Sequence, residues 1–298
     1  MERAVPFHVI AGSFFATNYS PDGDTIRFKP DAPADLAMLD GVPPSVNARG
    51  HASLRLEGID ALETHFEGRH QPLALANSAR DELLRLVGIT NIVWDARQGS
   101  VVSSVDGTPG FIVSRATDKF GRIIAFVFGG APPAASGSRI FLDTALLDIS
   151  VNAEMIRAGL AYPTYYSGLF ADLRNHLTGL VSAARAAGAG VYGVDSTNTL
   201  FAVPDIGALT DQHVILPKLF RRASAYVAAA GTIVGFKQAL ADNSEPVLDL
   251  TQGHFTHLDT FVEESGNQIR LTRRPEELVF DPMPERPGGE FTALVNGD

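Results

Sequence analysis

Cysteine is absent from the 298 residues, which excludes disulfide bridges, thiolate metal ligands and cysteine nucleophiles. Long apolar stretches are absent too. The longest, from Ala225 to Phe236, falls short of the roughly 20 residues that a membrane-spanning helix requires. The first residues make a poor signal peptide, because Pro6 and His8 interrupt a weak apolar run. We therefore expect no membrane partner and a cytoplasmic protein, or a secreted one if a signal peptide has been removed.

Basic residues are scarce relative to acidic ones, with 24 Lys and Arg against 34 Asp and Glu and a net charge of −10. Proteins that bind nucleic acid mainly through phosphate contacts are usually basic, so this balance argues against such a partner unless a local patch or a bound cation reverses the sign. Residues 1–200 carry 16 basic and 20 acidic side chains (net −4), and residues 201–298 carry 8 and 14 (net −6). We therefore expect the C-terminal third to be the poorer surface for a polyanion.

The order of local patterns predicts the architecture of the first two thirds. Hydrophobic residues make up 45% of the chain and charged residues 19%, as in an ordinary globular protein. Periodicity and turn residues predict strands on both sides of a turn at 21–24, from 54, and at 91–94, 110–115 and 122–128. They predict helices over 72–87, ending at Gly88, and over 169–187. Between these helices, a short helix is predicted with Asn152 as its N-cap and Gly159 as its end. This order indicates an α+β fold in which helices pack on a small antiparallel barrel.

The pattern changes after Gly193. Residues 194–210 read as a connector, residues 211–240 as a helical region that Pro217 interrupts, and residues 254–298 as strands and turns. We therefore divide the chain into a first domain at 1–196 and an accessory α+β region at 197–298. That region contains enough apolar residues for an ordered core but no recognisable catalytic residues. We expect it to pack on the side of the barrel away from any active site, or to form an interaction surface, so that a chain truncated after Asn198 stays folded and active.

Three separated polar clusters occur in the first domain: Asp22-Gly23-Asp24-Thr25, the segment LRLEGIDALET, and Asp118-Lys119-Phe120-Gly121-Arg122. Taken singly, each is an ordinary turn or a solvated strand. Together, in this order and with Arg55 five residues before Asp60 and eight before Glu63, they resemble the staphylococcal-type nuclease (thermonuclease) family. The resemblance covers most of residues 10–195 and includes the segments NAEMIRAGLAYPTYY and AARAAGAGVYG.

The resemblance implies a five-stranded OB-fold-type barrel and a Ca²⁺-dependent hydrolase that cleaves phosphodiester bonds of DNA, RNA or both. Asp24, Asp60 and the carbonyl of Ala61 would hold the cation, in keeping with the preference of Ca²⁺ for oxygen ligands. Glu63 would activate the attacking water, and Arg55 and Arg122 would hold the phosphate. The substrate would also contact Phe120, Tyr165 and Tyr166. The sequence indicates no particular protein partner.

Some positions depart from the family pattern. Leu62 stands where the family usually has proline, Ala61 where it often has threonine, and Phe120 where it often has tyrosine. Phe120 can still stack on a base but offers no hydroxyl group. Core packing of either Tyr165 or Tyr166 is as compatible with the pattern as substrate contact. The alternative to an enzyme is a non-catalytic module that binds nucleic acid or protein on the same barrel. The enzyme is favoured because all five charged residues of the family pattern are present, namely Asp24, Arg55, Asp60, Glu63 and Arg122.

Overall fold

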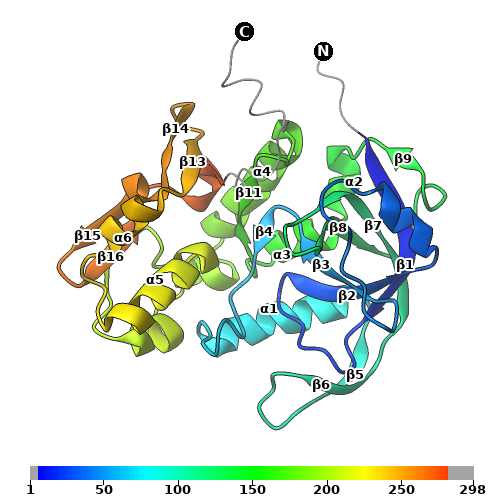
Figure 1. Ribbon diagram of the computed structural model, residues 1–298, viewed down its shortest axis with the longest axis horizontal. Helices are drawn as coiled ribbons and strands as arrows, with labels where there is room; N and C mark the ends of the chain where they lie inside the picture. Colours follow the sequence, from blue (N-terminus) through cyan, green and yellow to red (C-terminus); the bar gives the residue numbers. More distant parts are fainter. Residues whose placement is uncertain (1–5, 281–298) are drawn as a thin grey trace.

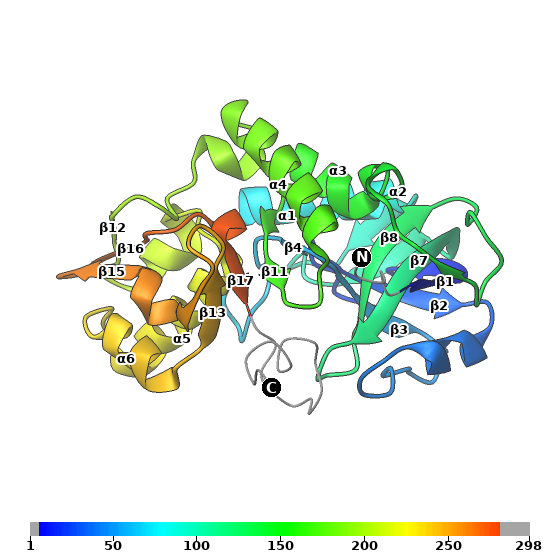
Figure 2. The ribbon, with the colours of Figure 1, turned by 90° about the horizontal axis from the view of Figure 1, so that it is seen from above.

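The computed structural model describes residues 6–280, which form a barrel lobe (residues 6–196) and a C-terminal lobe (residues 197–280) lying side by side (Figures 1 and 2). Five strands of the barrel lobe (β1, β2, β3, β8 and β7) close into a ring, because β1 pairs with both β2 and β7. A sixth strand, β9, also pairs with β1. The strands are β1 (Phe7–Phe15), β2 (Thr25–Pro30), β3 (Ala52–Leu56), β7 (Thr108–Thr117), β8 (Ile123–Gly129) and β9 (Arg139–Ile140). The predicted barrel with helices packed on it is confirmed.

One pair of barrel strands corrects the antiparallel expectation. β3 and β8 run parallel, with Leu54 opposite Ile123, whereas the other pairs of the ring are antiparallel. Parallel neighbours need a long connection between them. Here the connection consists of β4 (Ile59–Asp60), helix α1 (Leu73–Leu86), the hairpin of β5 (Thr90–Trp94) and β6 (Val101–Val105), and β7. Alternate strand residues such as Phe14, Phe28 and Phe126 fill the interior and are fully buried.

Three α-helices of the barrel lobe lie close to their predicted ranges: α1 (Leu73–Leu86), α3 (Val151–Arg157) and α4 (Ala171–Ala186). A fourth, the short α2 (Thr144–Asp148), was not predicted. Gly88 and Gly159 follow α1 and α3 with φ of 81° and 66°, a conformation that favours glycine. The N-cap of α3, however, is Ser150 and not Asn152. Asn152 is buried, and its amide bonds to Val127 N and Glu57 O at 3.0 and 2.8 Å, which fastens the helix to the barrel.

The C-terminal lobe is a separate set of helices and short strands: β12 (Phe201–Ala202), α5 (Pro217–Ala230), α6 (Phe236–Asn243), β13 (Pro246–Asp249), β14 (His254–His257), β15 (Val262–Ser265), β16 (Gln268–Leu271) and β17 (Leu278–Phe280). Pro217 does not interrupt a helix, as the pattern suggested, but starts α5. Its missing N–H and fixed φ suit the first helical turn. The strands expected over 254–298 are present as far as Phe280, and the remainder lies outside the described residues.

The two lobes share backbone pairing and core. β17 pairs in parallel with β11 (Tyr165–Tyr166), a strand of the barrel lobe that follows β10 (Tyr162–Pro163). Arg185 of α4 forms an ion pair with the buried Glu276 at 3.0 Å, and the buried apolar side chains make one continuous cluster through both lobes. Between residues 6 and 280, no helix is long and apolar enough to cross a membrane.

Candidate functional site

Strand pairing brings the first two predicted clusters to one end of the barrel. Thr25 of β2 is opposite Arg55 of β3, and the amide of Leu56 donates to the carbonyl of Asp24 at 2.9 Å. The chain then turns through β4, which ends at Asp60, and reaches Glu63 three residues later. Asp24, Arg55, Asp60 and Glu63 are thus neighbours although they come from separate segments.

Gly23 explains why the turn before Asp24 can lie so close to Asp60. A Cβ atom at this position would come within 2.5 Å of the Ala61 Cβ and 2.8 Å of the Ala79 Cβ. Such distances are shorter than side-chain atoms tolerate, so only glycine fits between the loop after β4 and helix α1. The glycine of the Asp-Gly-Asp motif is therefore required by packing between the first cluster and the second.

The third cluster reaches the same face through the parallel pairing. Arg55 is opposite Ile124, so Arg122, two residues earlier, projects from the same face of the sheet. Arg122 donates to Asp118 at 2.6 Å, and its positive charge acts on the pKa of Asp24. Phe120, at the tip of this turn, is 68% exposed. The turn therefore presents an arginine to the carboxylates and an open aromatic ring beside it.

The two tyrosines after α3 have different environments. Tyr165 is fully buried and its hydroxyl bonds to Thr178 at 3.0 Å, so it packs in the core and does not face the site. The hydroxyl of Tyr166 accepts from Arg55 at 3.3 Å, and the Arg55 guanidinium lies 5.1 Å from the centre of the Tyr166 ring. Burial acts to raise the pKa of Tyr166, but the charges of Arg55 and Lys218 outweigh it and hold the pKa below its usual value.

Arg221 of α5 is the residue that the sequence did not indicate. Its guanidinium donates to both carboxylate oxygens of Asp60, at 3.1 and 2.7 Å, and also bonds to Glu63. The expectation that the C-terminal region packs away from the site is therefore wrong. The available signal was weak: Lys218 and Arg221 are three residues apart on an otherwise largely apolar helix, a spacing that places both on one face.

The charges at the site shift the pKa values of the carboxyl groups in different directions. Burial raises the pKa of Asp24, and the neighbouring Asp60 charge raises it further. Burial also works against ionisation of Asp60, yet the charge and hydrogen bonds of Arg221, together with Arg55, hold its pKa below the ordinary value. Burial raises the pKa of Glu63 to about 7, with Arg221 opposing the shift and Asp60 adding to it. Glu63 is thus able to exchange a proton near neutral pH.

The oxygens that the resemblance assigns to a cation do not fit one in this arrangement. Asp24 and Asp60 are hard oxygen ligands of the kind Ca²⁺ prefers, and Ala61 adjoins them. Both oxygens of Asp60, however, already accept hydrogen bonds from Arg221. Within the described range 6–280, no group of three or more His, Asp or Glu side chains is arranged to hold a metal ion. A divalent cation and Arg221 cannot use the same Asp60 oxygens at once.

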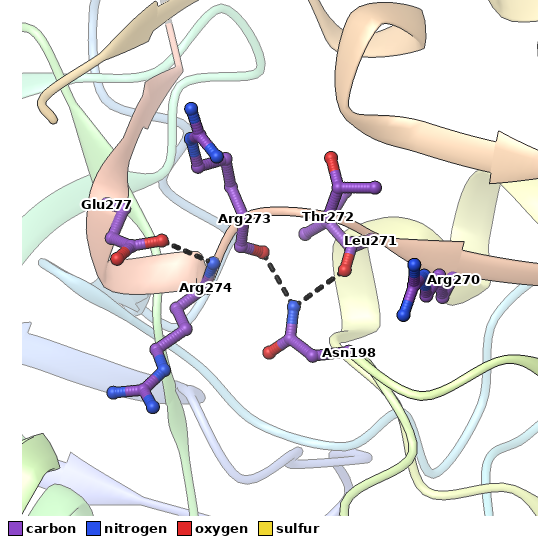
Figure 3. A pocket seen from close by; sticks show the side chains of 7 residues that line it. All are labelled: Asn198, Arg270, Leu271, Thr272, Arg273, Arg274 and Glu277. Carbon is purple, nitrogen blue, oxygen red and sulfur yellow. Dashed lines mark hydrogen bonds between the residues drawn. The ribbon is translucent and has the colours of Figure 1, made fainter. Parts of the chain in front are cut away.

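A separate cavity of about 430 Å³ lies in the C-terminal lobe (Figure 3). Its lining residues are Asn198, Arg270, Leu271, Thr272, Arg273, Arg274 and Glu277. Two of its arginines are already paired, Arg270 with Glu263 and Arg273 with Asp249. The amide of Asn198 donates to the carbonyls of Leu271 and Arg273, so it holds the wall together. None of the predicted site residues lines this cavity.

Comparison with models of known protein families and with curated protein sequences gives no match for this chain. The fold and the convergence of charged residues at one end of the barrel are therefore the observations on which a function can be argued.

Proposed function

We propose that this chain is a nuclease, a hydrolase of phosphodiester bonds in DNA or RNA, with Glu63 as general base and Arg55 and Arg122 as phosphate ligands. The observation that carries the proposal is the convergence of the three polar clusters. Arg55 and Arg122 both act electrostatically on Asp24, and Asp24 and Asp60 both act on Glu63. Residues 22 to 122 supply this arrangement from three separate turns and strands, which is difficult to attribute to ordinary surface charge.

The chemistry follows from the side chains present. A water molecule attacks phosphorus as Glu63 accepts its proton, and the bond from phosphorus to the leaving ester oxygen breaks, with solvent protonating that oxygen. A carboxylate whose pKa lies near 7 suits this task at neutral pH. The guanidinium forks of Arg55 and Arg122 match the phosphoryl oxygens and stabilise the negative charge that develops there. Phe120, exposed at the rim, offers a ring on which a base can stack.

The topology supports an OB-type assignment of the barrel, which is part of the proposal. The five strands close in the order β1-β2-β3-β8-β7, with the parallel pair between the third and the last strand in sequence. Barrels of this kind bind oligonucleotides on a strand face and its adjoining loops. Arg55 of β3 and the turn before β8 occupy such a face.

A nicking assay tests the proposal. Full-length protein is incubated with supercoiled plasmid and with RNA, in Ca²⁺ and in chelator, because the resemblance also implies a calcium requirement. We expect cleavage in Ca²⁺ that Glu63→Gln lowers by about 10²–10⁴-fold, the usual contribution of a general base. Glu67→Gln is the matched control, since Glu67 is exposed on the same loop and pairs only with Arg69 among the ion pairs of the described chain. Equal cleavage by both variants would remove Glu63 from the mechanism.

One observation favours a second candidate, a binding module without catalysis. Asp60 and Glu63 are both engaged by Arg221. Arg55 and Arg122, in contrast, pair with neither of these carboxylates among the ion pairs of the described chain. Such a site would bind a nucleic acid strand without hydrolysing it. Saturable binding of single-stranded DNA or RNA with no cleavage at any Ca²⁺ concentration would support this candidate over the enzyme.

A further inference from the structure

Arg221 makes three hydrogen bonds to the carboxylates of the site. Its two terminal nitrogens reach both oxygens of Asp60, and one of them also bonds to Glu63. The side chain of Asp60 is only 1% exposed and that of Arg221 only 17%. A planar fork that meets a carboxylate in this bidentate way is the strongest form of the arginine–carboxylate pair. The contact is thus a buried, specific ion pair and not a transient surface one.

The helix that presents Arg221 is fixed to the barrel lobe at several points. Just before α5, the carbonyl of Ile215 accepts from the Gln71 side chain at 2.8 Å. The ring of Phe220 packs edge-on against that of Phe66, with centroids 6.4 Å apart. Lys218, one turn earlier, lies 5.4 Å from the Tyr166 ring and pairs with Glu245 at 2.7 Å. Arg221 therefore enters the site from a rigid element on which other contacts converge.

Charge accounts for why a cation is needed at this position. The charge of Asp60 makes ionisation of Asp24 more costly, and Asp24 and Asp60 together do the same for Glu63. All three carboxyl groups are largely shielded from water. Buried carboxylates of this kind require a compensating positive charge. Arg55 and Lys218 supply part of it at Asp60, and Arg221 supplies the largest share, at the oxygens themselves.

We propose that Arg221 is a built-in cation of this site, so that a divalent cation binds Asp60 only in exchange for the Arg221 guanidinium. The C-terminal lobe thereby sets the concentration at which the site takes up Ca²⁺. This inference deepens the proposed nuclease function and rests on it for its biological meaning, although cation binding can be measured independently of cleavage. Release of Arg221 would also leave its charge beside the phosphate-facing arginines.

The test compares two substitutions on the same helix by calorimetric titration with Ca²⁺ and by thermal melting. Arg221→Met removes the built-in cation and keeps an apolar stem of similar length. Arg222→Gln removes the same charge from the next residue, whose guanidinium pairs with Glu245 and not with the site. We expect Arg221→Met to bind Ca²⁺ on the order of tenfold or more tightly than wild type, because its carboxylates have lost their partner. Its melting temperature should rise with added Ca²⁺, whereas that of Arg222→Gln should respond as wild type does.

Binding of Ca²⁺ by wild type and Arg221→Met with the same affinity would overturn the proposal. If Arg221→Met does not fold, Arg221→Lys keeps the charge but loses the fork, and it should bind Ca²⁺ more tightly than wild type. Wild-type affinity in Arg221→Lys would then overturn the proposal. The two proposals can fail separately: tighter Ca²⁺ binding by Arg221→Met without any cleavage of DNA or RNA would remove the nuclease function and leave the exchange at Asp60 intact.

Discussion

The C-terminal lobe is the more acidic of the two lobes per residue, yet it supplies a positive charge to the site, whereas the barrel lobe supplies the carboxylates. Residues 201–298 carry 8 basic and 14 acidic side chains, but they contribute the arginine that neutralises the barrel's carboxylates. The barrel lobe supplies Asp24, Asp60 and Glu63. The net charge of a segment thus says little about which sign it presents at one particular contact, because a single buried side chain decides that.

Truncation after Asn198 removes the C-terminal lobe and should have the largest effect on stability. Without the C-terminal lobe, β11 loses its partner β17, Glu276 leaves Arg185, and Asp60 loses Arg221. We expect the truncated chain to lose its cooperative unfolding transition, because truncation also exposes the apolar core that the lobes share, and a typical domain is stable by only roughly 5–15 kcal/mol. Circular dichroism melting measures this. A truncated chain with the melting temperature of the full chain would show that the lobes are energetically independent.

Removal of Arg221 alone should destabilise the protein by about 3–5 kcal/mol, since it leaves a buried carboxylate without its partner. The cost should fall in the double variant Asp60→Asn with Arg221→Met, where the uncompensated charge is gone as well. Urea denaturation of wild type, both single variants and the double variant gives the coupling energy. Additive effects of the two substitutions would show that the ion pair across the lobes contributes nothing.

Glu57 tests the barrel lobe by itself, because the charged groups that act on its pKa belong to that lobe. Burial raises its pKa from 4.5 to about 7, with Arg55 and Arg115 opposing the shift. The folded chain therefore holds this proton more tightly than the unfolded chain, so stability is lost as pH rises from about 4.5 through 7. At about 1.4 kcal/mol per pH unit, Glu57→Gln should be up to about 3 kcal/mol more stable than wild type at pH 8 and no more stable at pH 4.

Urea denaturation at pH 4, 6 and 8 checks this expectation. Glu67→Gln, at an exposed position of the same lobe, serves as the control for the loss of a carboxyl group. An identical pH profile for Glu57→Gln and wild type would contradict the assignment.

Gly23→Ala should have the smallest effect, about 1–3 kcal/mol, and it too is confined to the barrel lobe. The added Cβ would meet the Cβ atoms of Ala61 and Ala79 at 2.5 and 2.8 Å, and overpacking of this kind costs energy in that range. Gly99→Ala is the matched control, because nothing lies within 4 Å of a Cβ there. Equal melting temperatures for the two variants would mean that the loop after β4 can move away freely.

Local patterns predicted the elements whose residues interact with near neighbours. The helix from Leu73, the strands around the turn at Asp24 and the terminating glycines Gly88 and Gly159 were all readable, because periodicity and left-handed backbone requirements are properties of short segments. Spacing and resemblance also indicated which polar residues belong together, and the structure does bring Asp24, Arg55, Asp60, Glu63 and Arg122 to one end of the barrel.

Other features depended on contacts that no short segment encodes. Asn152 looked like an N-cap but serves as a buried link to the barrel, since its partners at Val127 and Glu57 are distant in sequence. The parallel β3–β8 pair results from how the intervening chain packs. Arg221 contacts Asp60 across 161 residues, and its spacing from Lys218 is too weak a signal to distinguish it from Arg222. Short sequence motifs were enough to predict the carboxylates of the candidate site and the arginine five residues before Asp60. Which cation neutralises those carboxylates follows only from the folded chain, because it depends on how the two lobes dock.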